Sequence, residues 1–385
     1  MGPGPGERRG EGRENGPFPK LRRPAAGRPA HISGPVPVHW EGRGVSALSF
    51  SEFLAQLSDP GFRLVVLLTL GVILVNGWTD APNAIATAVS SGALSYRAAV
   101  ALAAGCNLLG AAVTAAFRPA VAQSIYGLAD FGPQPRAALC ALCAAMLSIV
   151  LWSAAAWVFG IPTSESHALV AALTGAAAAL GGGLSSVNWG VWAGVLRGLF
   201  LSVGLGFLLG RGLGGVKARR RGRAFYRRAQ TAAAAAMAFL HGAQDGQKFL
   251  GVFLLGTALA QGRQESGALA VPLWLLVLCA LTMALGTCLG GRRIIDRVGR
   301  EMVSLDPRQG CRADVAGGAC LLLCTLLGLP VSTTHAKTAA MLGVGSAGGR
   351  AGWATARSIA LTWALTFPGC ALLGFFSAKV LLFFL

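Results

Sequence analysis

The stretch "NGWTDAPNAIATAVS", residues 76–90, decides how this chain folds. It directly follows the apolar run Leu64–Val75, yet it places Asp80 and Asn83 where a helix that crosses a membrane should still be apolar. A run of these twelve residues is too short to cross a hydrocarbon core about 30 Å thick, which takes about 20 residues as a helix. Apolar character resumes only after Pro82. The stretch therefore predicts a membrane helix that is broken near its middle.

The composition indicates a chain that is embedded in lipid. Of its 385 residues, 54% are hydrophobic and 12% are charged, whereas a soluble domain carries about 25% charged residues. Largely apolar stretches close to the length of a membrane helix follow at 98–117, 137–159, 188–210, 271–290 and 353–376. We therefore expect an all-α polytopic membrane protein with about 10–12 membrane segments.

The motif around Asp80 occurs twice. The sequence "HGAQDGQKFLG" at 241–251 repeats the layout of "NGWTDAPNAIA" at 76–86, and it aligns Asp245 with Asp80. The second copy also interrupts an apolar segment, because the run before it stops at His241. Half-length segments that meet at corresponding polar breaks are typical of discontinuous helices around a binding site near the membrane midplane. We expect such a break in both copies.

A second motif is duplicated downstream. The sequence "IPTSESHALVAALTGA", from residue 161, recurs 168 residues later as "LPVSTTHAKTAAMLGV", which pairs Ser164 with Ser332 and His167 with His335. Both motifs recur in the same order at nearly equal spacing, so the chain contains a duplicated unit.

Four segments follow from this duplication and from the composition. Residues 1–60, rich in Gly, Pro, Arg and Glu, have the composition of a disordered arm. The two transmembrane repeats span 61–210 and 229–385, and they are joined by the linker 211–228, which contains eight basic residues and no acid. A short loop of that kind is retained on the cytoplasmic side of a membrane.

The basic residues of the chain gather between the apolar spans. Lys and Arg number 33 against 15 Asp and Glu, and a second basic loop lies at 291–312. We expect this loop to lie on the same side as the linker. Because the excess charge sits in loops that flank apolar spans, it fits a membrane protein, and we expect no nucleic acid partner. The pair Cys140 and Cys143 lies in an apolar run, where cysteine behaves as a small buried residue, so we expect no cofactor.

The two aspartates need compensation if they lie inside a membrane. A charged side chain near the bilayer centre costs between about 3 and over 10 kcal/mol, depending on the reference state. A single aspartate there could be structural and cap a half-helix. Two aspartates at equivalent breaks, Asp80 and Asp245, instead favour a site for a hard cation or a proton.

The second motif has the complementary chemistry. Hydroxyl residues directly after Pro162 and Pro330 open two Ala-rich helices and could serve only as N-caps. A helix N-terminus is also a ready anion site, because it presents free N–H groups and the positive end of the helix dipole. Two matched N-termini would surround a tetrahedral oxyanion with donors from both repeats.

These motifs resemble a known family. "NGWTDAPNAIATAVSSGAL" (76–94), "HGAQDGQKFLG" (241–251) and "GLPVSTTHAKTAAMLGVG" (328–345) are similar to the duplicated signatures of the inorganic phosphate transporter (PiT) family, in a bacterial form. The resemblance runs from about residue 64 to the C-terminus. It implies a secondary transporter with inverted-topology repeats, a homodimer, that carries inorganic phosphate with a proton or sodium across the cytoplasmic membrane. With a cytoplasmic linker, inverted repeats place the segment before residue 64 outside.

The resemblance implies that Asp80, Asn83 and Asp245 serve the cation and that Ser164, Ser166, Ser332, Thr333 and Thr334 hold phosphate. Further residues of the same motifs are added to these two sets. The residues expected to bind the cation or couple protons are Asp80, Asn83, Asp245 and Glu165, and Asp80 and Asp245 are the expected metal ligands if the cation is sodium. The residues expected to bind phosphate are Thr163, Ser164, Ser166, His167, Gln247, Lys248, Ser332, Thr333, Thr334 and His335.

Several residues depart from the commonest family pattern and leave the coupling ion open. They are Thr79, Gln244, Glu165, Lys248 and Lys337. Lys248 aligns with Asn83, so it could neutralise Asp245, contact a phosphate oxygen, or extend to the membrane interface. Glu165 could carry a proton, which would favour protons over sodium, or it could be a charge on the dipole of a half-helix.

Two other functions fit parts of the pattern. A permease of the same fold for sulfate or another tetrahedral oxyanion would need a similar site, although phosphate near pH 7 still carries a proton that a carboxylate can accept. An intramembrane hydrolase could use a Ser, His and Asp set, but catalysis would not need that set in duplicate. We therefore expect a transporter and not an enzyme.

Overall fold

The computed structural model describes residues 1–2, 49–117, 119–159, 163–217, 221–262, 271–303, 305–349 and 351–384. Residues 43–385 belong to one compact unit. The predicted disordered arm falls largely on residues 3–48, which lie outside the described residues. Its predicted end at residue 60 is too late, because α1 (Phe50–Gln56) is a helix with a capping box between Ser49 and Glu52. Phe53 of α1 is buried and lies 4.6 Å from Trp274, measured between ring centroids.

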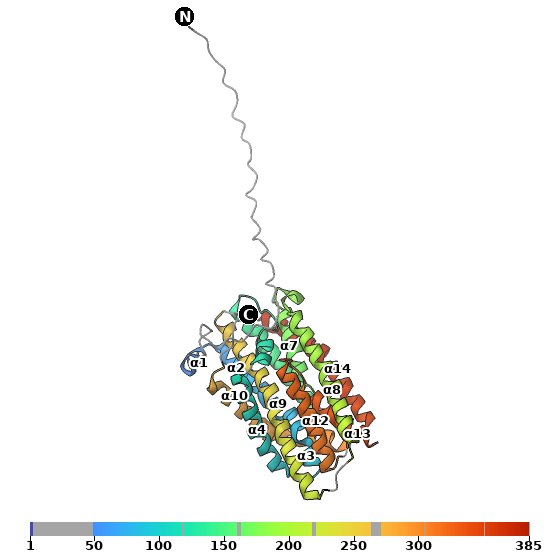
Figure 1. Ribbon diagram of the computed structural model, residues 1–385. Helices are drawn as coiled ribbons and strands as arrows, with labels where there is room; N and C mark the ends of the chain where they lie inside the picture. Colours follow the sequence, from blue (N-terminus) through green and yellow to red (C-terminus); the bar gives the residue numbers. More distant parts are fainter. Residues whose placement is uncertain are drawn as a thin grey trace. The chain divides into compact units, whose positions relative to one another are not determined.

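The described part of residues 43–385 is built from helices (Figure 1). In chain order they are α1, α2 (Pro60–Thr79), α3 (Ala81–Ser90), α4 (Tyr96–Phe117), α5 (Ala120–Tyr126), α6 (Pro135–Val158), α7 (Glu165–Ala178), η1 (Gly183–Ser186), α8 (Trp189–Gly215), α9 (Arg223–Ala260), α10 (Leu273–Gly290), α11 (Arg292–Asp296), η2 (Arg297–Met302), α12 (Pro307–Leu326), α13 (Thr333–Ala347) and α14 (Trp353–Phe383). Among the described residues, strand pairing is limited to one isolated bridge between Ala129 and Val187. The predicted all-α class is confirmed.

Five helices in the described part are long and apolar enough to cross a membrane. They are the segment Pro60–Ser90, which joins α2 and α3, together with α4, α6, α8 and α14. A sixth span results if Leu273–Leu289 of α10 and the segment Arg292–Gly299, which is bent away from it, are counted together as one span. The expected number of about 10–12 segments stays a prediction, because α7 and α13 are short and α9 and α12 carry many polar residues.

The predicted break is limited in the first copy to a one-residue interruption at Asp80 within the span Pro60–Ser90, and it is absent from the second copy. In the first copy α2 ends and α3 begins at Asp80, two residues before Pro82. Proline has no N–H and its ring crowds the preceding turn, so it interrupts the helix there. The second copy has no proline, and α9 runs unbroken through the motif (Figure 1). The expectation of a discontinuous helix at His241 and Gly242 was therefore wrong.

The glycines of the second copy bring helices together instead of breaking one. A Cβ atom added to Gly242 would lie 2.1 Å from the carbonyl oxygen of Asn107, and one added to Gly246 would lie 2.5 Å from the Cβ of Ala111. From the other side, a Cβ on Gly110 of α4 would lie 1.8 Å from the carbonyl oxygen of Phe239. Small residues that allow such close backbone contact are how membrane helices associate.

Helix packing is reciprocal between the two halves of the chain. The half-length helix α13 packs on α8, and its counterpart α7 packs on α14; likewise α9 packs on α4, and α2 packs on α10. Each contact between two helices is thus repeated by the counterparts of those two helices. This reciprocity agrees with the predicted duplication.

The two halves begin at opposite ends of the helical unit. The segment α2–α3 starts beside α1 and the start of α10, where Phe53 contacts Trp274. It ends near Ala93, whose carbonyl oxygen accepts a hydrogen bond from Arg227 at the start of α9 (3.5 Å). Since α9 opens the second half, the second half begins near the place where the segment α2–α3 ends. The inverted orientation of the two repeats stays a prediction that agrees with this arrangement.

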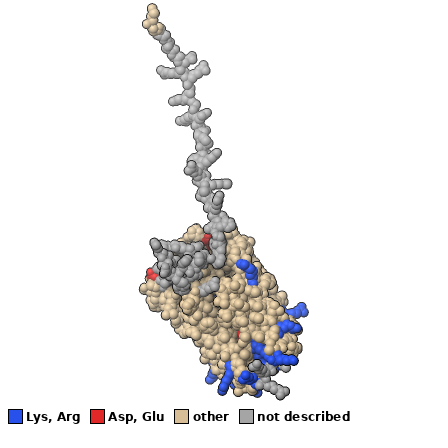
Figure 2. Space-filling view, in the orientation of Figure 1, with Lys and Arg blue, Asp and Glu red and all other residues tan. Residues whose placement is uncertain are grey.

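Basic side chains gather at the end where α9 begins (Figure 2). Arg312 of α12 donates hydrogen bonds to the carbonyl oxygens of Gly214 (3.1 Å) and Val216 (2.6 Å) at the end of α8. The described parts of the basic loops 211–228 and 291–312 therefore lie together, as the sequence predicts. Their assignment to the cytoplasmic side rests on the general preference of basic loops for that side.

Candidate functional site

The tips of the two half-length helices meet inside the helical unit. Ser164 caps α7 by accepting from the backbone N–H of His167, and Ser332 caps α13 by accepting from that of His335. The Ser164 hydroxyl donates to the Ser332 hydroxyl over 2.9 Å. Both serines have no exposed surface. Two helix N-termini, one from each repeat, thus direct the positive ends of their dipoles at one buried point.

A threonine at one tip connects the two aspartates. The hydroxyl of Thr333 lies 3.4 Å from Asp80 Oδ2 and 3.3 Å from Asp245 Oδ2. The carboxylates come from the α2–α3 break and from the middle of α9, 165 residues apart. The structure therefore brings both predicted cation residues to the tip of α13.

Asp80 is surrounded by neutral donors. Asn83 Nδ2 donates to Asp80 Oδ1 (3.2 Å) and to the hydroxyl of Thr334 (3.0 Å). Thr334 in turn donates to Asp80 Oδ1. Asn83 Oδ1 is buried and has no hydrogen-bond partner among the described residues. We call Asp80, Asn83 and Thr334 the first half-site.

Asp245 is paired with a cation. Lys248 Nζ lies 2.6 Å from Asp245 Oδ1, 2.5 Å from Ser166 Oγ and 2.6 Å from the carbonyl oxygen of Val331. An ammonium group has three protons to donate, and here each has an oxygen acceptor. None is left for a phosphate oxygen in this arrangement. We call Asp245, Lys248 and Ser166 the second half-site.

Two further polar residues complete the surroundings of Asp245. His241 Nε2 and Asn76 Nδ2 lie 3.2 Å and 3.4 Å from Asp245 Oδ2. Ligand atoms of Asp80, His241 and Asp245 all lie within 4.8 Å of one another, close enough to bind one metal ion. The sequence interpretation used Asn76 and His241 only as helix breakers. Their equivalent positions, four residues before each aspartate on the same helix face, were the signal that they belong to the site.

Glu165 lies at the edge of this group of polar residues. Its Oε1 accepts a hydrogen bond from Thr79 (3.1 Å), and its Oε2 is buried without a partner among the described residues. The carboxyl group is 3% exposed. A buried carboxyl oxygen without a donor is consistent with a group that takes up a proton or ligates a cation.

Some predicted phosphate residues point elsewhere. Gln247 Oε1 accepts from the backbone N–H of Val121 (3.1 Å) and Gln247 Nε2 donates to its own helix, so its side chain faces α5 and is not brought to the tips. Thr163 accepts from Trp152 Nε1 (3.2 Å). The rings of His167 and His335 pack on each other at 4.4 Å and continue into aromatic side chains of α14.

The site is closed to solvent. The side chains of both half-sites and of the two caps are at most 6% exposed. Burying an ion is costly unless it is paired and hydrogen-bonded. Within the two half-sites Asp245 has the ammonium group of Lys248 beside it and Asp80 has no partner of opposite sign, so the first half-site is suited to bind a cation.

Comparison with known proteins identifies the family. The model of the phosphate transporter family matches residues 76–216 and 214–374, which covers both repeats. The chain belongs to the phosphate transporter family. The predicted resemblance is therefore confirmed, and because the family consists of transporters, so is the expectation that the chain is not an enzyme.

Bacterial relatives of this family member cover most of its length. A probable low-affinity inorganic phosphate transporter of Bacillus subtilis (strain 168) is 34% identical over 81% of this chain and 94% of its own length. A protein of the same description from Mycobacterium tuberculosis (strain H37Rv) is 36% identical over 82% of this chain and 76% of its own length. These matches, with the apolar spans, identify a multi-pass cell membrane protein.

A solved structure has the same fold. It is described as the sodium-dependent phosphate transporter, aligns with a TM-score of 0.70 at 22% identity, and covers 85% of this chain and all of that chain. At this identity the likeness establishes the fold.

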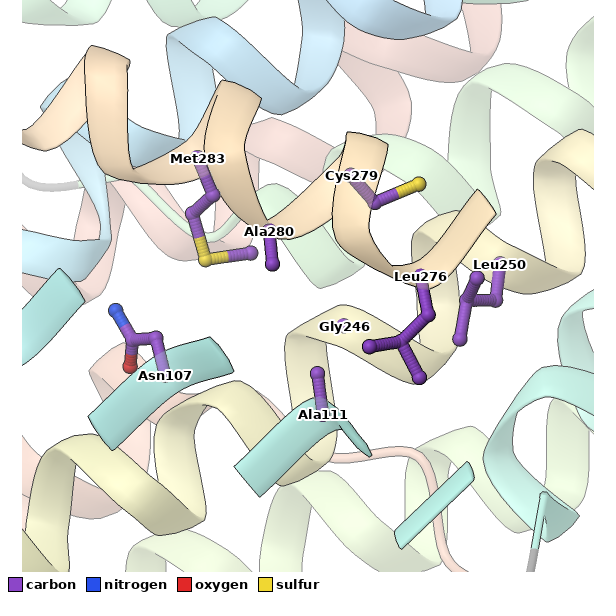
Figure 3. A pocket seen from close by; sticks show the side chains of 8 residues that line it. All are labelled: Asn107, Ala111, Gly246, Leu250, Leu276, Cys279, Ala280 and Met283. Atoms are coloured by element: carbon purple, nitrogen blue, oxygen red, sulfur yellow. The ribbon is translucent and has the colours of Figure 1, made fainter. Parts of the chain in front are cut away.

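A small pocket of this transporter lies beside the site but not in it. It is located between α4, α9 and α10, where Asn107, Gly246 and Met283 line it (Figure 3). None of the residues that line it belongs to either half-site. The site itself is packed closely enough that it must open before an ion the size of phosphate can enter.

Proposed function

We propose that the protein is a symporter that moves inorganic phosphate across the cytoplasmic membrane together with a monovalent cation, a proton or sodium. The observation that carries this proposal is the contact of Ser164 with Ser332, because it joins the N-termini of α7 and α13 next to the aspartates. An anion site and a cation site that share one buried volume are what coupled transport of the two ions requires.

The proposed phosphate site lies between the two helix tips. The first N–H groups of a helix have no partner within the helix, so two facing tips supply backbone donors from two directions. The hydroxyls of Ser164, Ser166 and Ser332 add donors at the same place. The names of the bacterial relatives, low-affinity inorganic phosphate transporters, support phosphate as the substrate.

The proposed cation site includes Asp80, Asn83 and the hydroxyls of Thr333 and Thr334. These groups offer oxygen atoms, which sodium prefers as a hard cation. Phosphate brings negative charge next to two carboxylates, so a bound cation lowers the cost of bringing it there. Binding of each ion would then favour binding of the other, which is the thermodynamic basis of coupling.

Uptake by the purified full-length protein in proteoliposomes tests the proposal. Radiolabelled phosphate should accumulate when a sodium or proton gradient is imposed, and unlabelled sulfate in tenfold excess should not compete. Asp80→Asn keeps the shape of the side chain but removes its charge, so accumulation should be lost while some phosphate exchange survives. Strong competition by sulfate would instead support an oxyanion permease of broader range. Wild-type gradient dependence in Asp80→Asn would show that this aspartate is structural.

Two other expectations remain open to experiment. The resemblance implies a homodimer, which the molar mass of the purified protein in detergent would reveal. The same uptake assay, with a proton gradient or a sodium gradient imposed alone, shows which of the two cations drives phosphate uptake. Glu165 supports a proton, because its Oε2 has no hydrogen-bond partner among the described residues, whereas the hydroxyl oxygens of Thr333 and Thr334 beside Asp80 support sodium.

A further inference from the structure

The two half-sites are built from equivalent residues. Asp80 aligns with Asp245, Asn83 with Lys248, and Thr334 with Ser166. The contacts repeat as well: Asn83 Nδ2 donates to its aspartate and to the hydroxyl of Thr334 in α13, and Lys248 Nζ donates to its aspartate and to the hydroxyl of Ser166 in α7. Each half-site thus combines an aspartate, the residue one helical turn later, and a hydroxyl from the opposite repeat.

The half-sites differ in charge. In the second, three oxygen atoms lie 2.5–2.6 Å from Lys248 Nζ, and they come from a carboxylate, a hydroxyl and a backbone carbonyl. This set of oxygens is one that a small monovalent cation would bind. In the first, Asn83 supplies no charge, and its Oδ1 is buried with no hydrogen-bond partner in the part of the chain that the structure describes. Asp80 has a neutral residue in the place where Asp245 has an ammonium group.

Burial excludes the simplest alternative for Lys248. A lysine that extended to the membrane interface would expose its amino group, but the side chain of Lys248 is only 2% exposed. Since the three donors of its ammonium group are already used, a role as a phosphate ligand would require this shell of oxygens to be broken. The contacts therefore assign the charge of Lys248 to Asp245.

We propose that the ammonium group of Lys248 is a built-in cation that permanently fills the second of two equivalent cation half-sites. Only the first half-site, with Asp80, Asn83 and Thr334, then exchanges a cation with solvent. The transporter moves one positive charge fewer per phosphate than a version with a neutral residue at 248 would. This inference rests on the proposed function, because it concerns how many cations accompany phosphate.

Exchange of the two equivalent residues tests the inference. The charge moved per phosphate is obtained in proteoliposomes from the membrane potential, set with potassium and valinomycin, at which radiolabelled phosphate flux stops. Lys248→Asn copies the first half-site and should raise the charge moved per phosphate by about one, the charge that a lysine carries. It should also make uptake depend more steeply on external NaCl, replaced by choline chloride, or on pH. Lys248→Arg retains a fixed cation and serves as the matched control.

The reverse exchange provides an independent arm. Asn83→Lys fills the first half-site and should abolish the response of phosphate flux to cation gradients, even if Lys248→Asn fails to reach the membrane. An unchanged charge per phosphate in Lys248→Asn, or a wild-type gradient response in Asn83→Lys, overturns the inference. Failure of the proposed function would look different, because the wild-type protein would then take up no phosphate under any gradient.

Discussion

The hydroxyl of Ser164 donates a hydrogen bond to that of Ser332 across 2.9 Å, and this contact joins two helix tips that belong to different repeats. An anion that binds between the tips replaces this serine–serine bond with bonds from both hydroxyls to itself. The site is therefore held closed by the same groups that would hold the substrate. Loss of one hydroxyl should weaken binding of the anion more than it weakens the fold.

Ser332→Ala tests this relationship. A hydrogen bond to a charged group contributes about 1.5–3 kcal/mol, so the KM for phosphate should rise about ten- to a hundredfold. Steady-state uptake into proteoliposomes, normalised to inserted protein, gives the value. Ser202→Ala is the control, because this equally buried serine donates only to Leu199 of its own helix. An unchanged KM in Ser332→Ala would show that this serine serves only as the N-cap of α13.

Duplication allows the sequence to pair the two aspartates, whereas Ser166, Lys248 and Thr334, which the structure places beside them, were expected to bind phosphate. Asp80 and Asp245 are recognised as a pair by their equal position in two motifs, and the structure brings them to the same threonine. Side-chain direction on a helix was harder to predict. Gln247 lies one residue before Lys248 and therefore about 100° away around α9. It faces α5 and not the site.

The break in the second copy was mispredicted for a different reason. Glycine in a membrane helix can either unwind the helix or admit a neighbouring backbone, and the sequence alone does not distinguish the two. At Gly242 the deciding contact is with Asn107, which is distant in the chain. Proline has no N–H to donate, so the helix is interrupted just before Pro82, although α2 and α3 still form one span from Pro60 to Ser90.

Gly110 should be intolerant of even one methyl group. Its added Cβ would lie 1.8 Å from the carbonyl oxygen of Phe239, so Gly110→Ala forces α4 away from α9. Overpacking of this kind costs about 1–3 kcal/mol, and backbone atoms cannot yield as side chains do. The Tm in detergent should fall by several degrees. Gly105→Ala, on the same helix with nothing within 4 Å of the added Cβ, should leave Tm unchanged or slightly raised.

Chain topology can be tested at two exposed residues from opposite ends of the helical unit. Ser58 precedes α2, and Ala224 lies in the first turn of α9. In a background without native cysteines, Ser58→Cys should react with an impermeant thiol reagent applied to intact cells. Ala224→Cys should react only after the cells are permeabilised, because the basic end is expected to be cytoplasmic. The reverse pattern would contradict the predicted orientation.

A second buried ion pair lies between the site and the basic end. Lys337, one turn after Thr333, pairs with Asp314 of α12, and Thr87 donates to both oxygens of that aspartate at 2.8 and 2.9 Å. Asp314→Asn leaves the buried ammonium unpaired, which costs about 3–5 kcal/mol. The Tm of the Asp314→Asn variant should fall strongly. The double variant Asp314→Asn with Lys337→Met should recover much of the lost Tm, because it has no unpaired buried charge. Arg308→Met breaks the exposed pair with Asp306 (3.7 Å) and should cost less than about 1 kcal/mol.

Asp245→Asn and Asp80→Asn should differ in their effect on stability, because only Asp245 has a buried ammonium group as its partner. Asp245→Asn removes the counter-ion of Lys248, which is buried and 2.6 Å away, so the variant should insert poorly or lose several degrees of Tm through a cost of about 3–5 kcal/mol. Asp80→Asn removes a carboxylate that has only neutral donors within its half-site, so this matched substitution should keep near wild-type stability while losing cation-driven accumulation.

Adding Lys248→Met to Asp245→Asn should restore stability but not transport, since the second half-site then has neither charge. Fluorescence-detected size-exclusion chromatography of membranes, with Tm in detergent, gives the comparison. Equal stability of the two single variants would show that Lys248 does not depend on Asp245, and that its charge is balanced elsewhere in the site.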